Sequence, residues 1–157
     1  DKLLVKSTPV SNISIKNSYN LSAKLGATSS LFQLSLNDIA ANDFSIVLSN
    51  KKGDELLIGY EKATNQYFID RSKSGIIAFE TGFAKKHTAP RLSSSKTISV
   101  TLIADVASVE LFADDGLTVM TDIFFPKQVY TTITVRSSKG VTVKKLTYTG
   151  VRTIHGK

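Results

Sequence analysis

Carboxylates between Asp105 and Asp122 have the clearest potential for chemistry. They gather in one short stretch of the 157-residue chain and are Asp105, Glu110, Asp114, Asp115 and Asp122. Two carboxylates on either side of a glycosidic bond can hydrolyse it, one as acid and the other as nucleophile or base. Such a pair must face the same space, so the local fold decides whether this stretch could be catalytic.

The same stretch has the pattern of two strands joined by a tight hairpin. Apolar residues recur at every second position on both sides of the turn, and the alternating residues are Val109, Leu111, Ala113, Val119, Thr121, Ile123 and Phe125. Asp115 and Gly116 suit the turn because both tolerate a positive φ, and Pro126 ends the second strand. Asp114 and Asp115 are expected to point to solvent, whereas Glu110 lies within a strand. This geometry disfavours most carboxylate pairs, and we expect no catalytic residue here.

A sugar site is the second kind of chemistry that the sequence could support. Charged groups bind vicinal hydroxyls strongly, and an aromatic ring covers a sugar face. The residues that supply these groups are Tyr67, Asp70, Arg71 and Glu110. Asp70 and Arg71 are strand neighbours that point to opposite faces unless the strand ends between them. The favoured alternative is that these residues form a polar network that holds strands together.

Short alternating runs separated by turn residues continue along the chain. The runs are Ile13 and Ile15; Leu21, Ala23 and Leu25; Phe32, Leu34 and Leu36; Phe44, Ile46 and Leu48; Ile98, Val100 and Leu102; Val141, Val143, Leu146 and Tyr148. Only the stretch 37–42 has the pattern of a helical turn. This periodicity predicts an all-β fold, a two-sheet antiparallel β-sandwich of about ten strands. We expect an extended leading segment or linker over 1–12, the sandwich over 13–150 and a C-terminal tail over 151–157.

The stretch from Lys73 to Ser95 lacks clear alternation and contains Gly75, Gly82 and Pro90. Long loops in compact domains are often binding or interface elements. His87 and Arg91 are therefore candidate interface residues, although an ordinary surface position is the simpler interpretation of His87.

Composition excludes several other functions. The net charge is +7, but the lysine pairs are small and far apart in sequence, so a solvated surface is favoured over a nucleic-acid site. The chain has no cysteine, and His87 and His155 have no neighbours at ligand spacing, so no metal or other cofactor is predicted. No apolar run approaches the roughly 20 residues of a membrane span.

The ordered motifs resemble the C-terminal module of glycoside hydrolase family 32, which includes levanases, inulinases and invertases. In the hairpin the matching residues are Asp105, Ser108, Val109, Glu110, Phe112, Asp115, Gly116, Thr121, Asp122 and Pro126. Upstream the matching motifs are Gly59-Tyr60-Glu61, Tyr67-Phe68-Ile69-Asp70-Arg71-Ser72 and Ser74-Gly75, followed in order by Phe79, Phe83, Ala89 and Pro90. The resemblance covers about residues 30 to 150. Val106 departs from the family's usual arginine, and Arg91 from its usual apolar residue.

The resemblance implies a non-catalytic β-sandwich whose partner is an N-terminal five-bladed β-propeller catalytic domain of the same protein. The propeller's catalytic motifs are absent here, since they include Trp-Met-Asn-Asp-Pro and Glu-Cys and the chain has neither Trp nor Cys. The parent would cleave β-fructosides with retention outside the cell or in the periplasm, and the module would serve stability and interdomain or subunit packing, including packing in a homodimer. Two alternatives stay open: an autonomous carbohydrate-binding module for levan or inulin, and an unrelated sandwich interaction domain.

Overall fold

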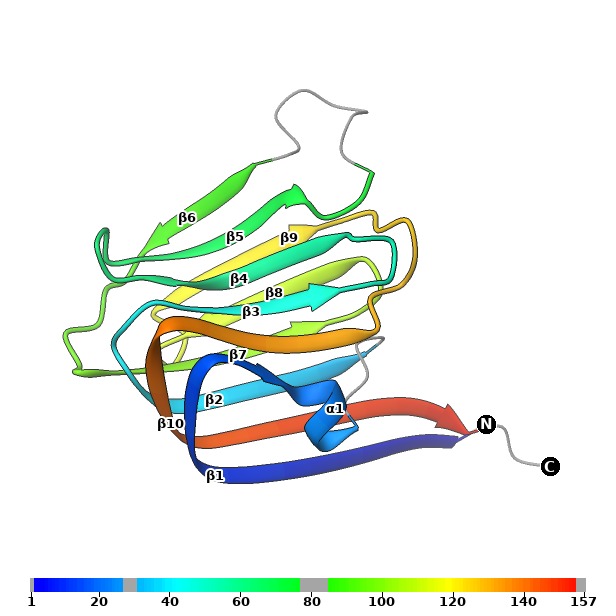
Figure 1. The fold of residues 1–157 in the computed structure, drawn as a ribbon, viewed down its shortest axis with the longest axis horizontal. Helices are drawn as coiled ribbons and strands as arrows, with labels where there is room; N and C mark the ends of the chain where they lie inside the picture. The colour runs from blue at the N-terminus through cyan, green and yellow to red at the C-terminus, as the bar shows by residue number, and fades with distance from the viewer. Residues whose placement is uncertain (1, 27–30, 77–84, 155–157) are drawn as a thin grey trace.

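Antiparallel strands make up most of the described chain (Figure 1). A computed structural model describes residues 2–26, 31–76 and 85–154. The elements are β1 (Lys2–Asn20), α1 (Leu21–Leu25), β2 (Phe32–Ala40), β3 (Phe44–Ser49), β4 (Glu55–Glu61), β5 (Gln66–Lys73), β6 (Lys86–Pro90), β7 (Thr97–Ala104), β8 (Ser108–Ala113), β9 (Thr118–Ile123) and β10 (Thr132–Ile154). Among the described residues, no helix is both long and apolar enough to span a membrane.

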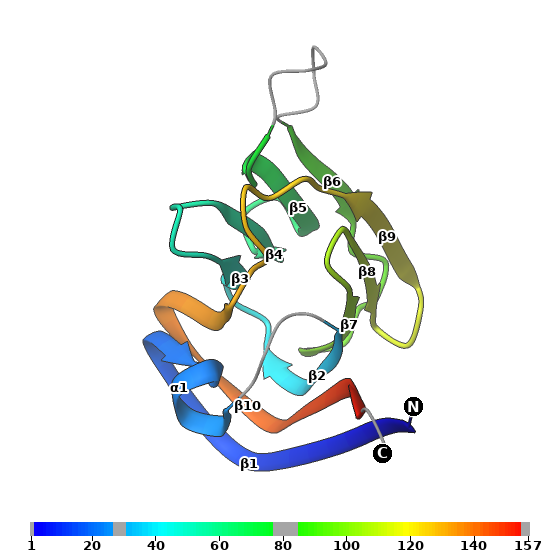
Figure 2. The ribbon, with the colours of Figure 1, turned by 90° about the vertical axis from the view of Figure 1, so that its right-hand side faces the viewer.

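The long strand β10 connects the two layers of the fold. Its first part, 132–136, pairs with β3, and its later part, 143–150, pairs with β2. The strand order is therefore β6-β5-β4-β3-β10-β2-β7-β8-β9, with β1 pairing along β10. The β1–β10 ribbon bends between the two pairings, and Figure 2 shows β3 to β6 facing β7 to β9 across the interior. The predicted two-layer antiparallel β-sandwich is confirmed.

At the opposite side of the molecule the two edge strands, β6 and β9, approach each other (Figure 2). The hydroxyl of Thr118 on β9 donates a hydrogen bond to the carbonyl of Pro90 on β6 at 2.9 Å. The sandwich is therefore almost closed into a barrel, and side chains rather than a continuous backbone ladder complete this edge.

Alternation along the strands places the core between the layers. The side chains of Leu34 and Leu36 on β2 are fully buried, as are those of Ile46 and Leu48 on β3. At about 25 cal/mol per Å² of apolar surface, burial of such side chains is the main stabilising contribution to the fold. Gly59 on β4 lets this strand approach β3 closely, because a Cβ there would overlap the carbonyl of Phe44.

Two secondary-structure predictions are wrong. The run Leu21–Leu25 is a short helix rather than a strand, because the Asn20 side chain caps it by accepting from the backbone N–H of Ala23 at 2.9 Å and Gly26 ends it at φ 66°. Residues 37–40, in the stretch expected to form a helical turn, belong to strand β2.

Strand β9 turns the opposite face inward from the one its apolar residues indicate. Met120 and, just beyond the strand, Phe124 are buried, whereas Val119 and Ile123 are each 52% exposed. The inward face also holds Asp122, whose charged neighbours are described below. Apolar alternation alone therefore identifies the strand correctly but its buried face wrongly.

The structure also locates the segments expected at the ends and in the long loop. Residues 2–11 pair with β10 as part of β1, and β10 extends to Ile154, so both ends of the described chain contribute to one ribbon. Strand β6 lies within the stretch expected to be a loop. Residues 77–84 of that loop and 155–157 of the expected tail lie outside the described residues.

Candidate functional site

Polar and charged side chains, most of them buried, close the edge at which β6 meets β9, and we refer to them as the edge cluster. Its members come from both layers and are Tyr67, Arg71, His87, Arg91, Asp114 and Asp122. The cluster divides into one group around Asp114 and another around Asp122. Charges are costly to bury unless they are paired and hydrogen-bonded, so the partners of each carboxylate determine what the cluster does.

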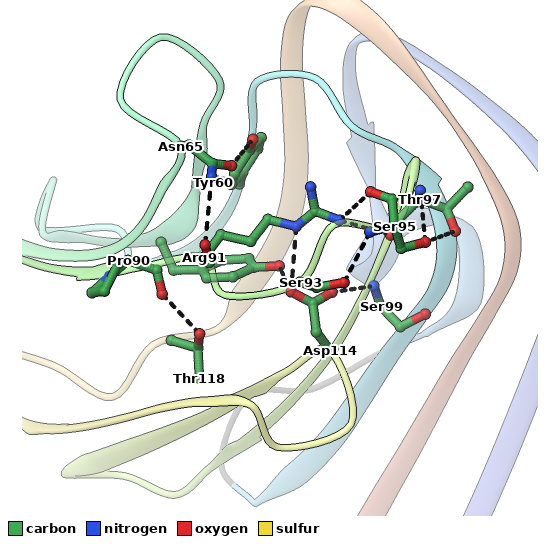
Figure 3. Close-up of polar contacts among 11 residues, drawn as sticks. Tyr60, Asn65, Pro90, Arg91, Ser93, Ser95, Thr97, Ser99, Asp114 and Thr118 are labelled. Carbon is green, nitrogen blue, oxygen red and sulfur yellow. Dashed lines mark hydrogen bonds and ion pairs between the residues drawn. The ribbon is translucent and has the colours of Figure 1, made fainter.

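Asp114 joins three parts of the fold (Figure 3). The hydroxyl of Tyr67 on β5 donates to Asp114 Oδ2 at 2.6 Å, and Arg91 Nε lies 3.4 Å from the same oxygen. The side chains of Asp114 and Arg91 are each only 6% exposed. Burial, followed by the hydrogen bond to Asp114, raises the pKa of Tyr67 well above its ordinary value, so the phenol stays protonated and donates.

The turn between β8 and β9 aims Asp114 inward, contrary to the prediction that it points to solvent. Asp114 adopts a left-handed conformation with φ 53°, which Asp accepts more readily than most residues. Its backbone N–H donates to the carbonyl of Ser99 at 2.7 Å, and the N–H of Ser99 donates back to Asp114 Oδ1 at 3.5 Å. These bonds anchor the turn to β7 and explain why a turn residue can be buried.

Arg91 is held by backbone carbonyls as well as by Asp114. Its Nη2 donates to the carbonyls of Ser95 and Thr97 at 2.6 and 3.1 Å, as Figure 3 shows. The guanidinium carbon lies 5.9 Å from the ring centre of Tyr60, within range of a cation–π interaction. Arg91 therefore fixes the segment after β6 against both layers.

The second group has Asp122 at its centre. Arg71 Nη1 lies 3.3 Å from Asp122 Oδ1, and His87 Nδ1 lies 2.7 Å from Asp122 Oδ2. Arg71 also donates to the backbone carbonyl of Ile123 at 3.0 Å. The side chains of Arg71 and Asp122 are 9% and 8% exposed, whereas His87 is 38% exposed. One carboxylate thus connects β5, β6 and β9.

The predicted sugar-site residues lie in different surroundings. Tyr67 and Arg71 are buried in separate groups of the edge cluster. Asp70 is half-buried and accepts a hydrogen bond from the backbone N–H of Ser72, and Glu110 is exposed on β8. The structure therefore does not bring these four residues to one surface. Of the interface candidates, the side chain of His87 is partly exposed and the side chain of Arg91 is buried.

The sequence patterns do not predict the buried roles of Asp114 and Asp54. Asp54, which is buried beside the β3–β4 turn, accepts from the Asn50 amide at 3.0 Å and from the backbone N–H of Lys127 at 2.8 Å. Burial raises the pKa of Asp54, but these hydrogen bonds and the Lys127 charge outweigh it and lower the pKa below the ordinary value. Asn50 followed by Gly53-Asp54 marks a turn in the sequence, but nothing there indicates a long-range partner at 127.

Taken together, the fold and the edge cluster define a β-sandwich domain whose buried carboxylates are bound to arginine, tyrosine, histidine or backbone N–H groups. In this arrangement the buried carboxylates hold neighbouring strands and turns together. The chain belongs to the family described as glycosyl hydrolases family 32 C terminal, whose pattern matches residues 1–150.

Sequence similarity to individual proteins is consistent with this family assignment. A levanase from Bacillus sp. (strain L7) is 37% identical over 87 residues, which are 55% of this chain and 9% of that protein. A levanase from Bacillus subtilis (strain 168) is 29% identical over 119 residues, 74% of this chain and 18% of that protein. The chain thus spans less than a fifth of either levanase.

Solved structures share the fold. The exo-inulinase from Aspergillus awamori superimposes with a TM-score of 0.73 at 26% identity, over 92% of this chain and 28% of that one. A fructofuranosidase from Schwanniomyces occidentalis, solved with fructose, gives a TM-score of 0.74 at 18% identity over 96% of this chain and 34% of that one. The second likeness concerns the fold alone.

Proposed function

We propose that this chain is the non-catalytic C-terminal sandwich of a fructan-hydrolysing enzyme of the levanase, inulinase or β-fructofuranosidase type. The observation that carries the proposal is the family match over residues 1–150, supported by the names of the similar levanases. On this proposal an N-terminal five-bladed β-propeller of the same protein performs retaining hydrolysis, and the sandwich stabilises it.

The state of the carboxylates supports a non-catalytic role. A glycosidase needs one carboxylic acid and one carboxylate facing the scissile bond, about 5–10 Å apart according to mechanism. Asp114 and Asp122 are instead buried beside Arg91 and Arg71, which neutralise their charges. Neither is presented to a polymeric substrate.

The outer face of β9 supports a role in packing. Val119 and Ile123 are each 52% exposed, and Phe125, just beyond the strand, is 41% exposed. Exposed apolar surface of this kind is typical of an interface. Because this chain covers 28% of the exo-inulinase chain, most of a comparable enzyme lies outside it, and we assign this face to the propeller rather than to a second subunit.

Secretion is part of the proposal. An extracellular exo-inulinase from Aspergillus niger is 35% identical over 89 residues, 55% of this chain. An enzyme encounters a polymeric fructan outside the cytoplasm, so we place the parent protein outside the cell or in the periplasm.

The test is fructose release from levan and from inulin by the purified 157-residue chain, with circular dichroism to verify folding. The expected result is no release above the buffer blank. Release that persists through further purification and scales with protein concentration would show that the chain is itself an enzyme. Glu110→Gln and Asp105→Asn variants would then identify the responsible carboxylate.

A further inference from the structure

A polar groove crosses the layer formed by β1, β10, β2 and β7. Its volume is about 500 Å³, and its lining includes Asn12 of β1, Asn37 and Asp38 of β2, Ser99 of β7, and Lys144 and Lys145 of β10. None of these residues is a member of the edge cluster, and of them only Ser99 contacts it, through its backbone bonds to Asp114. The groove therefore requires an explanation separate from the closure of the sandwich.

Irregular strand pairing produces this groove. On β10, Val143 and Leu146 are both buried, so the two lysines between them are both exposed instead of alternating. On β2, the register against β7 shifts between Leu36 and Ile39. Bulges of this kind redirect side chains and are common near binding sites.

Two groove residues also have an unusual backbone conformation. Asn12 and Asp38 both have φ 53°, in the left-handed region that few non-glycine residues adopt. Asn12 lies between Ser11 and Ile13, which pair with Lys145 and Val143 of β10. The irregularities of β1, β10 and β2 therefore lie side by side across the sheet.

Several polar groups in the groove are available to a ligand. Within the described part of the chain, the side chains of Asn12, Asn37, Lys144 and Lys145 make no hydrogen bond or ion pair with another residue. Asp38 Oδ1 accepts only a long hydrogen bond from Thr97, at 3.5 Å. This differs from the edge cluster, in which each carboxylate has close protein partners.

The chemistry of the lining favours a neutral, hydroxyl-rich ligand. A carboxylate accepts hydrogen bonds from sugar hydroxyls, ammonium groups donate to them, and carboxamides do both. The groove has no aromatic lining residue, so stacking on a flat apolar ligand is not its mode of binding. Asp38 lies in the same groove as the lysines and opposes binding of a polyanion.

We infer that this groove binds a glycan chain through its hydroxyl groups, away from the residues at which the sequence places a sugar site. The choice of fructan as the glycan rests on the proposed function. Bound there, a polymer would stay near the enzyme without contacting the edge cluster. The groove would then hold substrate at a second place on the same protein.

The test is affinity electrophoresis of the 157-residue chain in native gels that contain levan, inulin, dextran or dextran sulfate, or no polymer. The chain has an isoelectric point near 9.6 and migrates toward the cathode at neutral pH. The groove variants are Lys145→Ala, Asn37→Ala and Asp38→Asn, the last because Asn also tolerates the left-handed conformation. Lys16→Ala is the control, since it removes the same charge from an exposed lysine of β1 outside the groove.

The expected result is retardation by levan or inulin but not by dextran, with apparent affinity about tenfold or more weaker in each groove variant and unchanged in Lys16→Ala. Equal retardation of the groove variants and the unchanged chain would overturn the inference, as would no retardation at all. Retardation by dextran sulfate alone, abolished by salt, would reveal an anion site instead. Fructose release by the whole protein tests the proposed function separately, because it does not depend on binding in this groove.

Discussion

The phenolic oxygen of Tyr67 lies 2.6 Å from a carboxylate oxygen of Asp114, and this hydrogen bond joins β5 of one layer to the β8–β9 turn of the other. Both residues are buried. At this edge the hydrogen bond links the two layers, as backbone strand pairing links them along the β1–β10 ribbon. The stability of the sandwich should therefore depend on it.

Removing the Tyr67 hydroxyl should destabilise the chain without changing its fold. Tyr67→Phe deletes a hydrogen bond to a charged group and leaves the ring in place, at an expected cost of about 2 kcal/mol in the free energy of unfolding. Urea denaturation followed by circular dichroism measures this change. Tyr19→Phe is the matched control because Tyr19 is only half-buried on β1, and an equal loss in both variants would contradict the role given to Tyr67.

Truncation of Asp114 should cost more than truncation of its neighbour Asp115. Both residues are left-handed, with φ 53° and 58°, so alanine introduces a similar backbone strain at either position. Only Asp114→Ala removes the carboxylate beside the buried Arg91, and the additional loss should be about 3 kcal/mol. Equal unfolding midpoints in urea for the two variants would show that the ion pair contributes nothing.

The loss of stability at acidic pH should depend partly on Asp54. Its pKa is lowered in the folded chain, while in the unfolded chain it has the ordinary value of about 4. The unfolded chain therefore binds the proton more readily, so the stabilisation is complete above about pH 5 and is lost as the pH falls through the lower folded pKa. The difference in unfolding free energy between the unchanged chain and Asp54→Asn should shrink between pH 6 and pH 3. A constant difference would contradict this account.

Gly59→Ala should be among the most disruptive single substitutions. Its Cβ would overlap backbone atoms of β3, which cannot move aside without separating β3 from β4. We expect a loss of at least about 3 kcal/mol or a failure to fold. Gly26→Ala is the control. Gly26 has a positive φ that strains alanine, but a Cβ there would meet no neighbouring atom, so the cost should be about 1 kcal/mol. Similar thermal midpoints for the two variants would refute the steric argument.

The exposed face of β9 should contribute to stability only in the whole protein. Ile123→Lys places a charge on a side chain that is 52% exposed, so the isolated chain should keep its stability within about 0.5 kcal/mol. The whole protein should lose thermal stability if the propeller covers this face. Size-exclusion chromatography provides the control, because a change from dimer to monomer would identify a second subunit as the partner instead.

Local sequence patterns predicted most of the fold. Val109, Leu111 and Ala113 are buried as their alternation indicates, and Asp115-Gly116 does form the hairpin turn. The pattern was misleading at Leu21–Leu25, where the capping residue Asn20 outweighed the alternation. It also failed on β9, where pairing of Asp122 with Arg71 turns a charged residue inward and leaves Ile123 outside.

The edge cluster was harder to predict because its partners are distant in the sequence. Tyr67 and Asp114 are separated by 47 positions, and no local motif connects them. A turn aspartate is normally exposed to solvent, whereas Asp114 is buried because it bonds to Ser99, Tyr67 and Arg91. Predicting the groove has the same difficulty, since Asp38 and Lys144 come from strands that meet only in the folded sheet.

We propose that this sandwich stabilises a fructan hydrolase whose catalytic groups lie elsewhere. The most direct measurement is fructose release from levan and inulin by the whole protein, with and without residues 1–150, before and after heating. We predict that the truncated protein hydrolyses fructan when fresh but is inactivated at a lower temperature than the whole protein. Equal heat resistance of the two proteins, or hydrolysis by the 157-residue chain alone, would contradict the claim.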